Sequence, residues 1–98
     1  MSKIRIRGLT RAATECIEDQ YPDPSAPHNL TIGVTFIEGL PEDLLDAAQR
    51  IRDADVWMDW NGSNEAFYES AMQRIEEART RWAERIERAV RIAQHQHP

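Results

Sequence analysis

The longest regular pattern in this sequence is helical, and it occupies the last third of the chain. Between residues 64 and 94, apolar side chains recur every three or four positions, as they do along one face of an α-helix. A helix of about 31 residues would extend for roughly 46 Å at 1.5 Å per residue, which exceeds the diameter expected of a domain this small. Part of the helix must therefore project, or another surface must cover its apolar stripe.

Shorter patterns precede this helix and predict an α+β fold in a single domain, residues 1–98. We expect a small two- to three-stranded sheet packed against two or three helices, the last of them long. Alternating apolar residues indicate strands, and a three-to-four residue period indicates helices. The predicted elements are a strand at 3–7, a helix at 9–20, a strand at 30–37, a helix at 41–55 and the long helix at 64–94. Because a helix separates the two strands, they could also run parallel.

Local signals fix where the shorter helices begin. Thr10 is a suitable N-cap for the first helix, because its hydroxyl can accept a hydrogen bond from a first-turn amide. Pro41 suits the first turn of the second helix, where Glu42 and Asp43 also favour the positive end of the helix dipole. Cys16 lies on the apolar face of the first helix, so we expect a small buried side chain rather than a nucleophile.

The charges are distributed unevenly along the chain, whose formal net charge is −5. Acidic and basic residues balance over residues 1–37, and the basic residues exceed the acidic ones over residues 70–98. Over residues 38–69, nine acidic residues face only Arg50 and Arg52. An acidic surface attracts basic partners and repels nucleic acid, so direct DNA or RNA binding is disfavoured.

The stretch DADVWMDWNGS, residues 53–63, places large apolar side chains among acids. Trp57 and Trp60 lie within a few residues of Asp53, Asp55 and Asp59. The segment fits either a last helical turn or a short strand, and the following Asn-Gly pair predicts a turn. Tryptophan beside carboxylates suits a basic partner, because the indole ring offers apolar area and a cation–π face to arginine.

No motif in the sequence points to catalysis, a cofactor or a metal ion, so we expect a non-enzymatic protein that needs no cofactor. An EF-hand loop starting at Asp53 would need glycine at its sixth position and glutamate at its twelfth, where this chain has Met58 and Asn64. His95 and His97 stand beside the C-terminus, and too few nitrogen or sulfur ligands remain for a structural zinc site.

The first residues, MSKIRIRGLT, contain no apolar run that could act as a signal peptide, and no window of the sequence is apolar over the length that crosses a membrane. One cysteine suits a reducing compartment, so we expect a cytoplasmic protein. Lys3 is the only lysine among the twelve basic residues, a bias that suggests a GC-rich bacterial or phage genome.

The chain as a whole resembles the small acidic anti-CRISPR proteins of phages, on the acids from Glu38 to Glu69 and the DADVWMDW run. The resemblance is one of type, without a shared motif. It implies an inhibitor whose acidic surface, in the style of a DNA mimic, binds the basic nucleic-acid-binding face of a partner such as a CRISPR effector complex and blocks DNA binding. The residues predicted to contact that partner are Glu38, Glu42, Asp43, Asp46, Asp53, Asp55, Trp57, Asp59, Trp60, Glu65 and Glu69.

The main alternative is a homodimeric adaptor or assembly protein that associates through the long helix. In that case the seven-residue series Tyr68, Ile75, Trp82 and Ala89 would form the dimer seam. The same stripe could instead pack on a strand face formed by Ile32, Val34 and Phe36.

A DNA-binding regulator is the third candidate, and it rests on Lys3, Arg5 and Arg7 alone. The arginines of the long helix do not strengthen it, because glutamates alternate with them. That spacing predicts salt bridges Glu77–Arg81, Glu84–Arg88 and Glu87–Arg91 on a solvent-exposed face.

Overall fold

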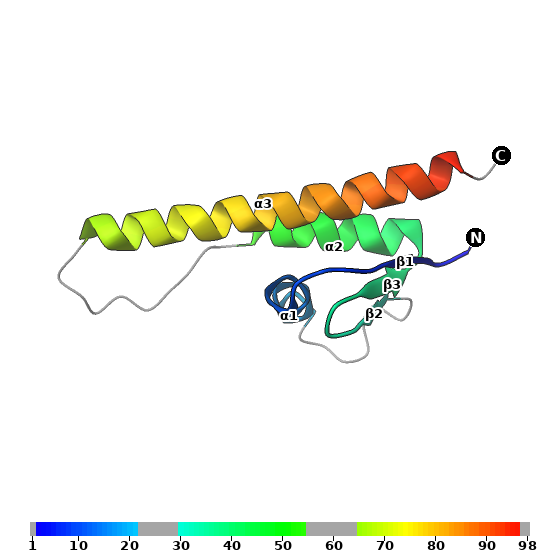
Figure 1. The fold of residues 1–98 in the computed structure, drawn as a ribbon, viewed down its shortest axis with the longest axis horizontal. Helices are drawn as coiled ribbons and strands as arrows, with labels where there is room; N and C mark the ends of the chain where they lie inside the picture. Colours follow the sequence, from blue (N-terminus) through cyan, green and yellow to red (C-terminus); the bar gives the residue numbers. More distant parts are fainter. Residues whose placement is uncertain (1, 22–29, 55–64, 97–98) are drawn as a thin grey trace.

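The computed structural model describes residues 2–21, 30–54 and 65–96 and shows a three-stranded sheet and three helices (Figure 1). The α+β class predicted from the sequence is therefore confirmed, with a long helix at the C-terminal end. In chain order the elements are β1 (Ile4–Ile6), α1 (Arg11–Asp19), β2 (Leu30–Ile32), β3 (Ile37–Gly39), α2 (Pro41–Asp53) and α3 (Glu65–His95).

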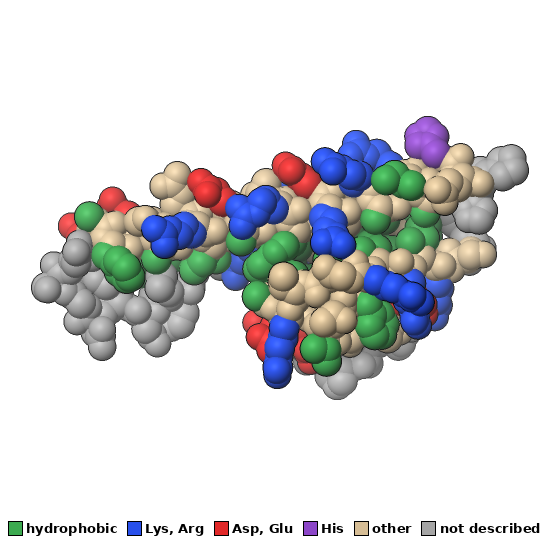
Figure 2. Space-filling view, viewed as in Figure 1, with side chains coloured by type: hydrophobic (Ala, Val, Ile, Leu, Met, Phe, Trp, Pro, Cys, Tyr) green, Lys and Arg blue, Asp and Glu red, His purple; other side chains and the backbone are tan. Residues whose placement is uncertain are grey.

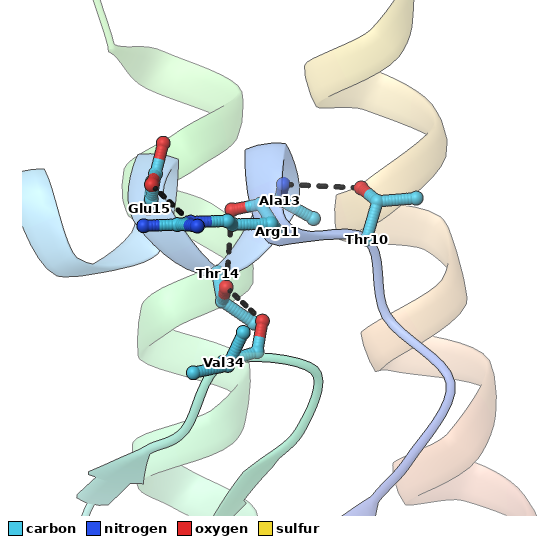
Figure 3. Close-up of polar contacts among 6 residues, drawn as sticks. All are labelled: Thr10, Arg11, Ala13, Thr14, Glu15 and Val34. Atoms are coloured by element: carbon cyan, nitrogen blue, oxygen red, sulfur yellow. Dashed lines mark hydrogen bonds and ion pairs between the residues drawn. The ribbon is translucent and has the colours of Figure 1, made fainter.

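Helix α1 begins after Thr10, as the sequence predicts, and its first turns are hydrogen-bonded to the turn between β2 and β3 (Figure 3). The Thr10 hydroxyl accepts a hydrogen bond from the Ala13 amide at 3.2 Å. One turn later the buried Thr14 hydroxyl donates to the carbonyl of Val34 at 2.7 Å. The Leu9 amide, which precedes the helix, also donates to the Thr35 carbonyl at 2.9 Å. The β2–β3 turn is therefore held by hydrogen bonds from Leu9 and from Thr14.

The sheet has the order β1-β3-β2, and both pairs of neighbours are antiparallel. The prediction of one strand over residues 30–37 was wrong, because the chain reverses there and forms a hairpin. Ile32 pairs with Ile37, and the Gly33 amide donates to the Phe36 carbonyl at 2.8 Å. Gly33 permits the reversal, because a side chain at that position would collide with the Phe36 ring.

The reversal also changes the side chains that the sheet presents. Val34 was expected on the apolar face of a long strand, but it sits in the turn and is 65% exposed. Helix α3 packs chiefly on α2 and, over a smaller area, on β1, rather than on a face made of Ile32, Val34 and Phe36.

The core lies where α2 runs antiparallel to the C-terminal half of α3, with α1 and the sheet closing the other side (Figure 1). Alanines in both helices let the two backbones approach closely, and isoleucine, leucine and valine fill the space between them. The buried side chains of the two helices are Leu44, Ala47, Ala48 and Ile51 from α2 and Ala83, Ile86 and Val90 from α3.

Only part of α3 takes part in this core. Its three buried residues all lie beyond residue 82, whereas residues 65–78 are exposed or half-buried. Figure 1 shows α3 continuing well past the end of α2, and the molecule is 56 Å long but only 28 Å wide in its second dimension. The long helix therefore extends beyond α2, as its length predicted. We call residues 65–78 the overhang.

Two isoleucines of α3 offer a matched test of this packing. Ile86 is fully buried, while Ile92 is 51% exposed on the same helix. We expect Ile86→Ala to lower the free energy of unfolding by about 2–5 kcal/mol, because it leaves a cavity between α2 and α3. Ile92→Ala should change it by less than about 0.5 kcal/mol. Urea unfolding followed by circular dichroism measures both, and equal losses would contradict the packing described.

Candidate interaction surface

The predicted partner-binding residues that the structure describes lie on three elements, β3, α2 and α3. Asp55, Trp57, Asp59 and Trp60 lie outside the described residues. Glu38 is on β3, and the other six occupy helices α2 and α3. These six are Glu42, Asp43, Asp46 and Asp53 on α2 and Glu65 and Glu69 at the start of α3.

Glu38 is engaged within the sheet. Its carboxylate accepts from Arg5 Nε at 2.9 Å across the β1–β3 pair. The same guanidinium lies 4.8 Å from the centre of the Phe36 ring, a distance at which the cation attracts the ring face. Because its charge is paired locally, Glu38 contributes little to an acidic surface.

Asp46 is held in a small polar cluster between α1 and α2. Its Oδ2 accepts from the Tyr21 hydroxyl at 2.7 Å and from Arg50 Nε at 2.8 Å. The hydrogen bond from Tyr21, followed by the Arg50 contacts, lowers the pKa of Asp46 below its ordinary value. Burial and the Asp46 carboxylate raise the pKa of Tyr21 in turn. Arg50 stacks over the Tyr21 ring at 4.8 Å, so the cluster anchors residue 21 to α2.

A pH titration tests this cluster. We expect Tyr21→Phe to raise the pKa of Asp46, because the tyrosine hydrogen bond favours the charged carboxylate. A lowered carboxyl pKa stabilises the fold above the unfolded-state pKa, near about 4, and that contribution is lost as pH falls through the lower, folded-state pKa. Side-chain carboxyl NMR of both proteins measures the shift, with Asp19 as an internal control. An Asp46 pKa that stays the same in the variant would contradict the account.

Asp43 points toward the body of the protein rather than outward. Its side chain is partly buried, and Oδ2 accepts no hydrogen bond from any residue that the structure describes. Asp43 stands in the first turn of α2, where the helix dipole favours a negative charge. Its place in the fold is better explained by the helix start than by contact with a partner.

The acids of α2 other than Asp43 lie along its solvent face, together with Gln49. Glu42, Asp46, Gln49 and Asp53 recur at helical spacing, on the side opposite the buried residues of this helix, and all four are exposed. Asp53 accepts a hydrogen bond from Gln49 Nε2 at 2.8 Å, which leaves its negative charge in place.

A second line of acids follows one edge of α3. Glu65, Glu69 and Glu76 are spaced by four and seven residues, so they share a helical edge, and all three are exposed. Further along the same edge Glu87 forms an ion pair with Arg52 of α2. This contact shows that the acidic edge of α3 is the edge that borders α2.

The two helices that carry these acids are in contact where α2 ends. An open hollow of about 220 Å³ is lined there by Arg52 and Ala54 from the end of α2 and by Glu76, Arg79 and Thr80 from α3. Arg79 Nη1 donates to the Ala54 carbonyl at 3.2 Å and fixes the junction. We call the five acids along these two lines that form no ion pair with a described residue the acidic strip. They are Glu42 and Asp53 on α2 and Glu65, Glu69 and Glu76 on α3, whereas Asp46 is paired with Arg50.

Glu76 was missed at the sequence level although it is central to the strip. It lies in the segment 70–98, where basic residues exceed acidic ones, and not in the acidic segment 38–69. The signal was present in the helical spacing from Glu65 and Glu69, which places the three side chains on one edge.

Apolar residues lie next to the α3 part of the strip. Tyr68, Met72 and Ile75 continue the core-facing side of α3 into the overhang, and they are half-buried. Phe67 is 68% exposed on a different side of the helix. The strip therefore combines carboxylates with accessible apolar area.

The predicted intrahelical salt bridges of α3 are not formed. Glu87 pairs with Arg52 rather than Arg91, and Glu77 accepts from Gln73 Nε2 at 3.4 Å. No ion pair joins Glu84 to Arg88 or Glu77 to Arg81 in the described part of the chain. Exposed pairs of this kind gain little free energy, so long side chains are not held in pairing geometry.

The groups with metal-binding chemistry are not gathered into a site among the described residues. Cys16 is buried as predicted, and burial raises the pKa of its thiol. Within residues 2–21, 30–54 and 65–96, no three His, Cys, Asp or Glu side chains are placed to hold a metal ion. None of the described helices has the length and apolar content that crossing a membrane requires.

Comparisons with known proteins add no relative. No protein-family model matches this chain, and comparisons with curated proteins and with solved structures give no significant match. The function proposed below therefore rests on the residues and their geometry.

Proposed function

We propose that this chain is a non-enzymatic interaction protein that binds a basic protein surface through the acidic strip. The supporting observation is that its carboxylates line up along the solvent face of α2 and the adjoining edge of the α3 overhang. Glu42, Glu65, Glu69 and Glu76 form no ion pair with any residue that the structure describes. Their charges are thus available to an incoming cationic group.

The strip has features that favour a protein partner over simple counterions. Met72 and Ile75 supply half-buried apolar area beside Glu69 and Glu76. Protein interfaces combine an apolar centre with a polar rim that excludes water, and complementary charge speeds association and selects the partner. Arginine suits this surface best, because its guanidinium pairs with carboxylates and its stem covers apolar side chains.

The length of the strip also fits the narrower proposal of an inhibitor that blocks a nucleic-acid-binding face. Residues 42–53 and 65–76 each extend for roughly 16 Å at 1.5 Å per residue. Because α2 and the overhang follow one another along the molecule (Figure 1), the two parts together approach one turn of B-form DNA, about 34 Å. Carboxylates along such a line can occupy a groove that normally holds phosphates.

The homodimer receives less support. Trp82 and Ala89, half of the proposed seven-residue seam, pack against the core of their own chain. Tyr68 and Ile75 remain in the overhang, where Glu65, Glu69 and Glu76 border them. Two copies meeting on this face would bring like charges together, which opposes self-association.

A peptide-binding experiment tests the proposed function. The probe is a fluorescein-labelled amphipathic peptide of arginine and leucine, and the readout is fluorescence anisotropy at physiological salt. We expect the triple variant Glu65→Gln, Glu69→Gln, Glu76→Gln to bind at least about tenfold more weakly than the natural chain, because three charge-assisted contacts are lost.

The control variant has the same change of net charge away from the strip. It combines Glu15→Gln, Glu77→Gln and Glu84→Gln, all at exposed positions on α1 and α3. The affinity of this control variant for the peptide should fall by less than about threefold, because only the overall electrostatic field of the protein is weaker. Equal weakening in the two triple variants, or no peptide binding by the natural chain, would overturn the assignment of the strip.

A further inference from the structure

The arginines of α3 form a row on the flank away from the acidic strip. Arg74, Arg81, Arg85 and Arg88 are spaced by seven, four and three residues, which places them within about 60° around the helix axis. The same geometry sets them roughly 150° from Glu69 and Glu76. In Figure 2, Lys and Arg side chains follow α3 along the viewed face and continue toward the sheet, with Asp and Glu side chains beside them on α3. We call these four residues the arginine row.

The row is exposed, and no ion pair joins it to the residues that the structure describes. All four side chains are exposed. The four ion pairs that join described residues involve Arg5, Arg11, Arg50 and Arg52 instead. Glu77 and Glu84 lie one turn from Arg81 and Arg88 but form no ion pair with them. The expectation that this chain avoids nucleic acid depended partly on such ion pairs.

One member of the row connects it to the basic N-terminal strand. Arg85 donates from Nη2 to the Arg7 carbonyl at 2.8 Å and from Nη1 to the Gly8 carbonyl at 3.2 Å. Gly8 has a positive φ of 75°, and a Cβ there would lie 3.2 Å from Arg85 Nη2, so glycine allows this close approach. Lys3 and Arg7 are exposed on the strand that Arg85 anchors, and neither forms an ion pair with a described residue.

We infer that the arginine row, with Lys3 and Arg7, binds the sugar-phosphate backbone of nucleic acid. Guanidinium groups pair with phosphates in two-pronged geometry, and a cationic row on a straight helix matches a regularly charged backbone. From Arg74 to Arg88 the row extends for roughly 21 Å, the length of about six base pairs. An acidic protein partner is less suitable, because the row has Ala78 rather than a large apolar residue near its centre.

This site uses different residues from the acidic strip and lies on the other flank of α3. The two surfaces can therefore be occupied together, so the protein can hold a basic partner on one side and a nucleic acid on the other. The net charge of −5 opposes approach of DNA from a distance, which makes the binding weak and strongly dependent on salt.

Anisotropy with a short fluorescein-labelled duplex of random sequence tests the inference at about 50 mM salt, where phosphate contacts are strong. The row variant is Arg81→Gln with Arg88→Gln, which spares the anchoring contacts of Arg85. The control is Arg11→Gln with Arg91→Gln, two exposed arginines outside the row. Circular dichroism confirms that both variants keep the helix content of the natural chain.

We expect the row variant to raise Kd at least about tenfold and to reduce the slope of log Kd against log salt by about two, one for each lost phosphate contact. The control should change Kd less than about threefold. Polyglutamate serves as a competitor and should not displace the duplex.

Three results would overturn the inference. They are no duplex binding by the natural chain at about 50 mM salt, equal weakening by both variants, and displacement of the duplex by polyglutamate. The last result would reassign the row to an acidic protein. The strip variant with Glu65, Glu69 and Glu76 changed should still bind DNA, so failure of this inference and failure of the proposed function are separate outcomes.

Discussion

The packing of α2 against only half of α3 determines the rest of this structure. Ala47, Ala48 and Ala83 bring the helices close, and Ile51 and Ile86 fill the contact. The second helix has 13 residues and the third has 31, so α2 cannot cover α3 along its length. The overhang follows from this mismatch, and it carries the exposed Glu65, Glu69 and Glu76.

One edge of α3 carries the glutamates of the acidic strip and another carries the arginine row, because each set recurs at helical spacing. Glu69 and Glu76 fall on the edge that borders α2, while Arg81 and Arg85 fall on the edge that borders β1. A net charge of −5 hides this separation. The net charge alone therefore does not describe how the charges are arranged around α3.

Helical periodicity made most of the fold predictable. Helices expected at 41–55 and 64–94 are found at Pro41–Asp53 and Glu65–His95, because an apolar stripe is a local signal. The strand predicted over 30–37 was wrong, since alternation indicates which side a residue faces but not where the chain turns back. Gly33 was the local signal for that reversal, and its role depends on the Phe36 ring that lies over it.

The candidate site was less predictable for a related reason. Summing charge along the chain assigned Glu38 to the same acidic surface as the strip. The sum could not show that Glu38 pairs with Arg5, because β1 and β3 are far apart in the sequence and become neighbours only in the folded sheet. The same count excluded Glu76, which the helix brings into line with Glu65 and Glu69. The salt bridges expected within α3 failed because Glu87 finds Arg52 on another helix. Asp55, Trp57, Asp59 and Trp60 lie outside the described residues, so their assignment to the surface stays a prediction.

The most direct test of two separate charged flanks is a single NMR titration of the ¹⁵N-labelled protein, first with the arginine–leucine peptide and then with duplex DNA. The peptide should shift backbone amides around Glu42, Asp53, Glu69 and Glu76. The DNA, added to the peptide complex, should shift those around Arg7, Arg81, Arg85 and Arg88 without displacing the peptide. Shifts of the same amides by both ligands, or displacement of one ligand by the other, would contradict the account.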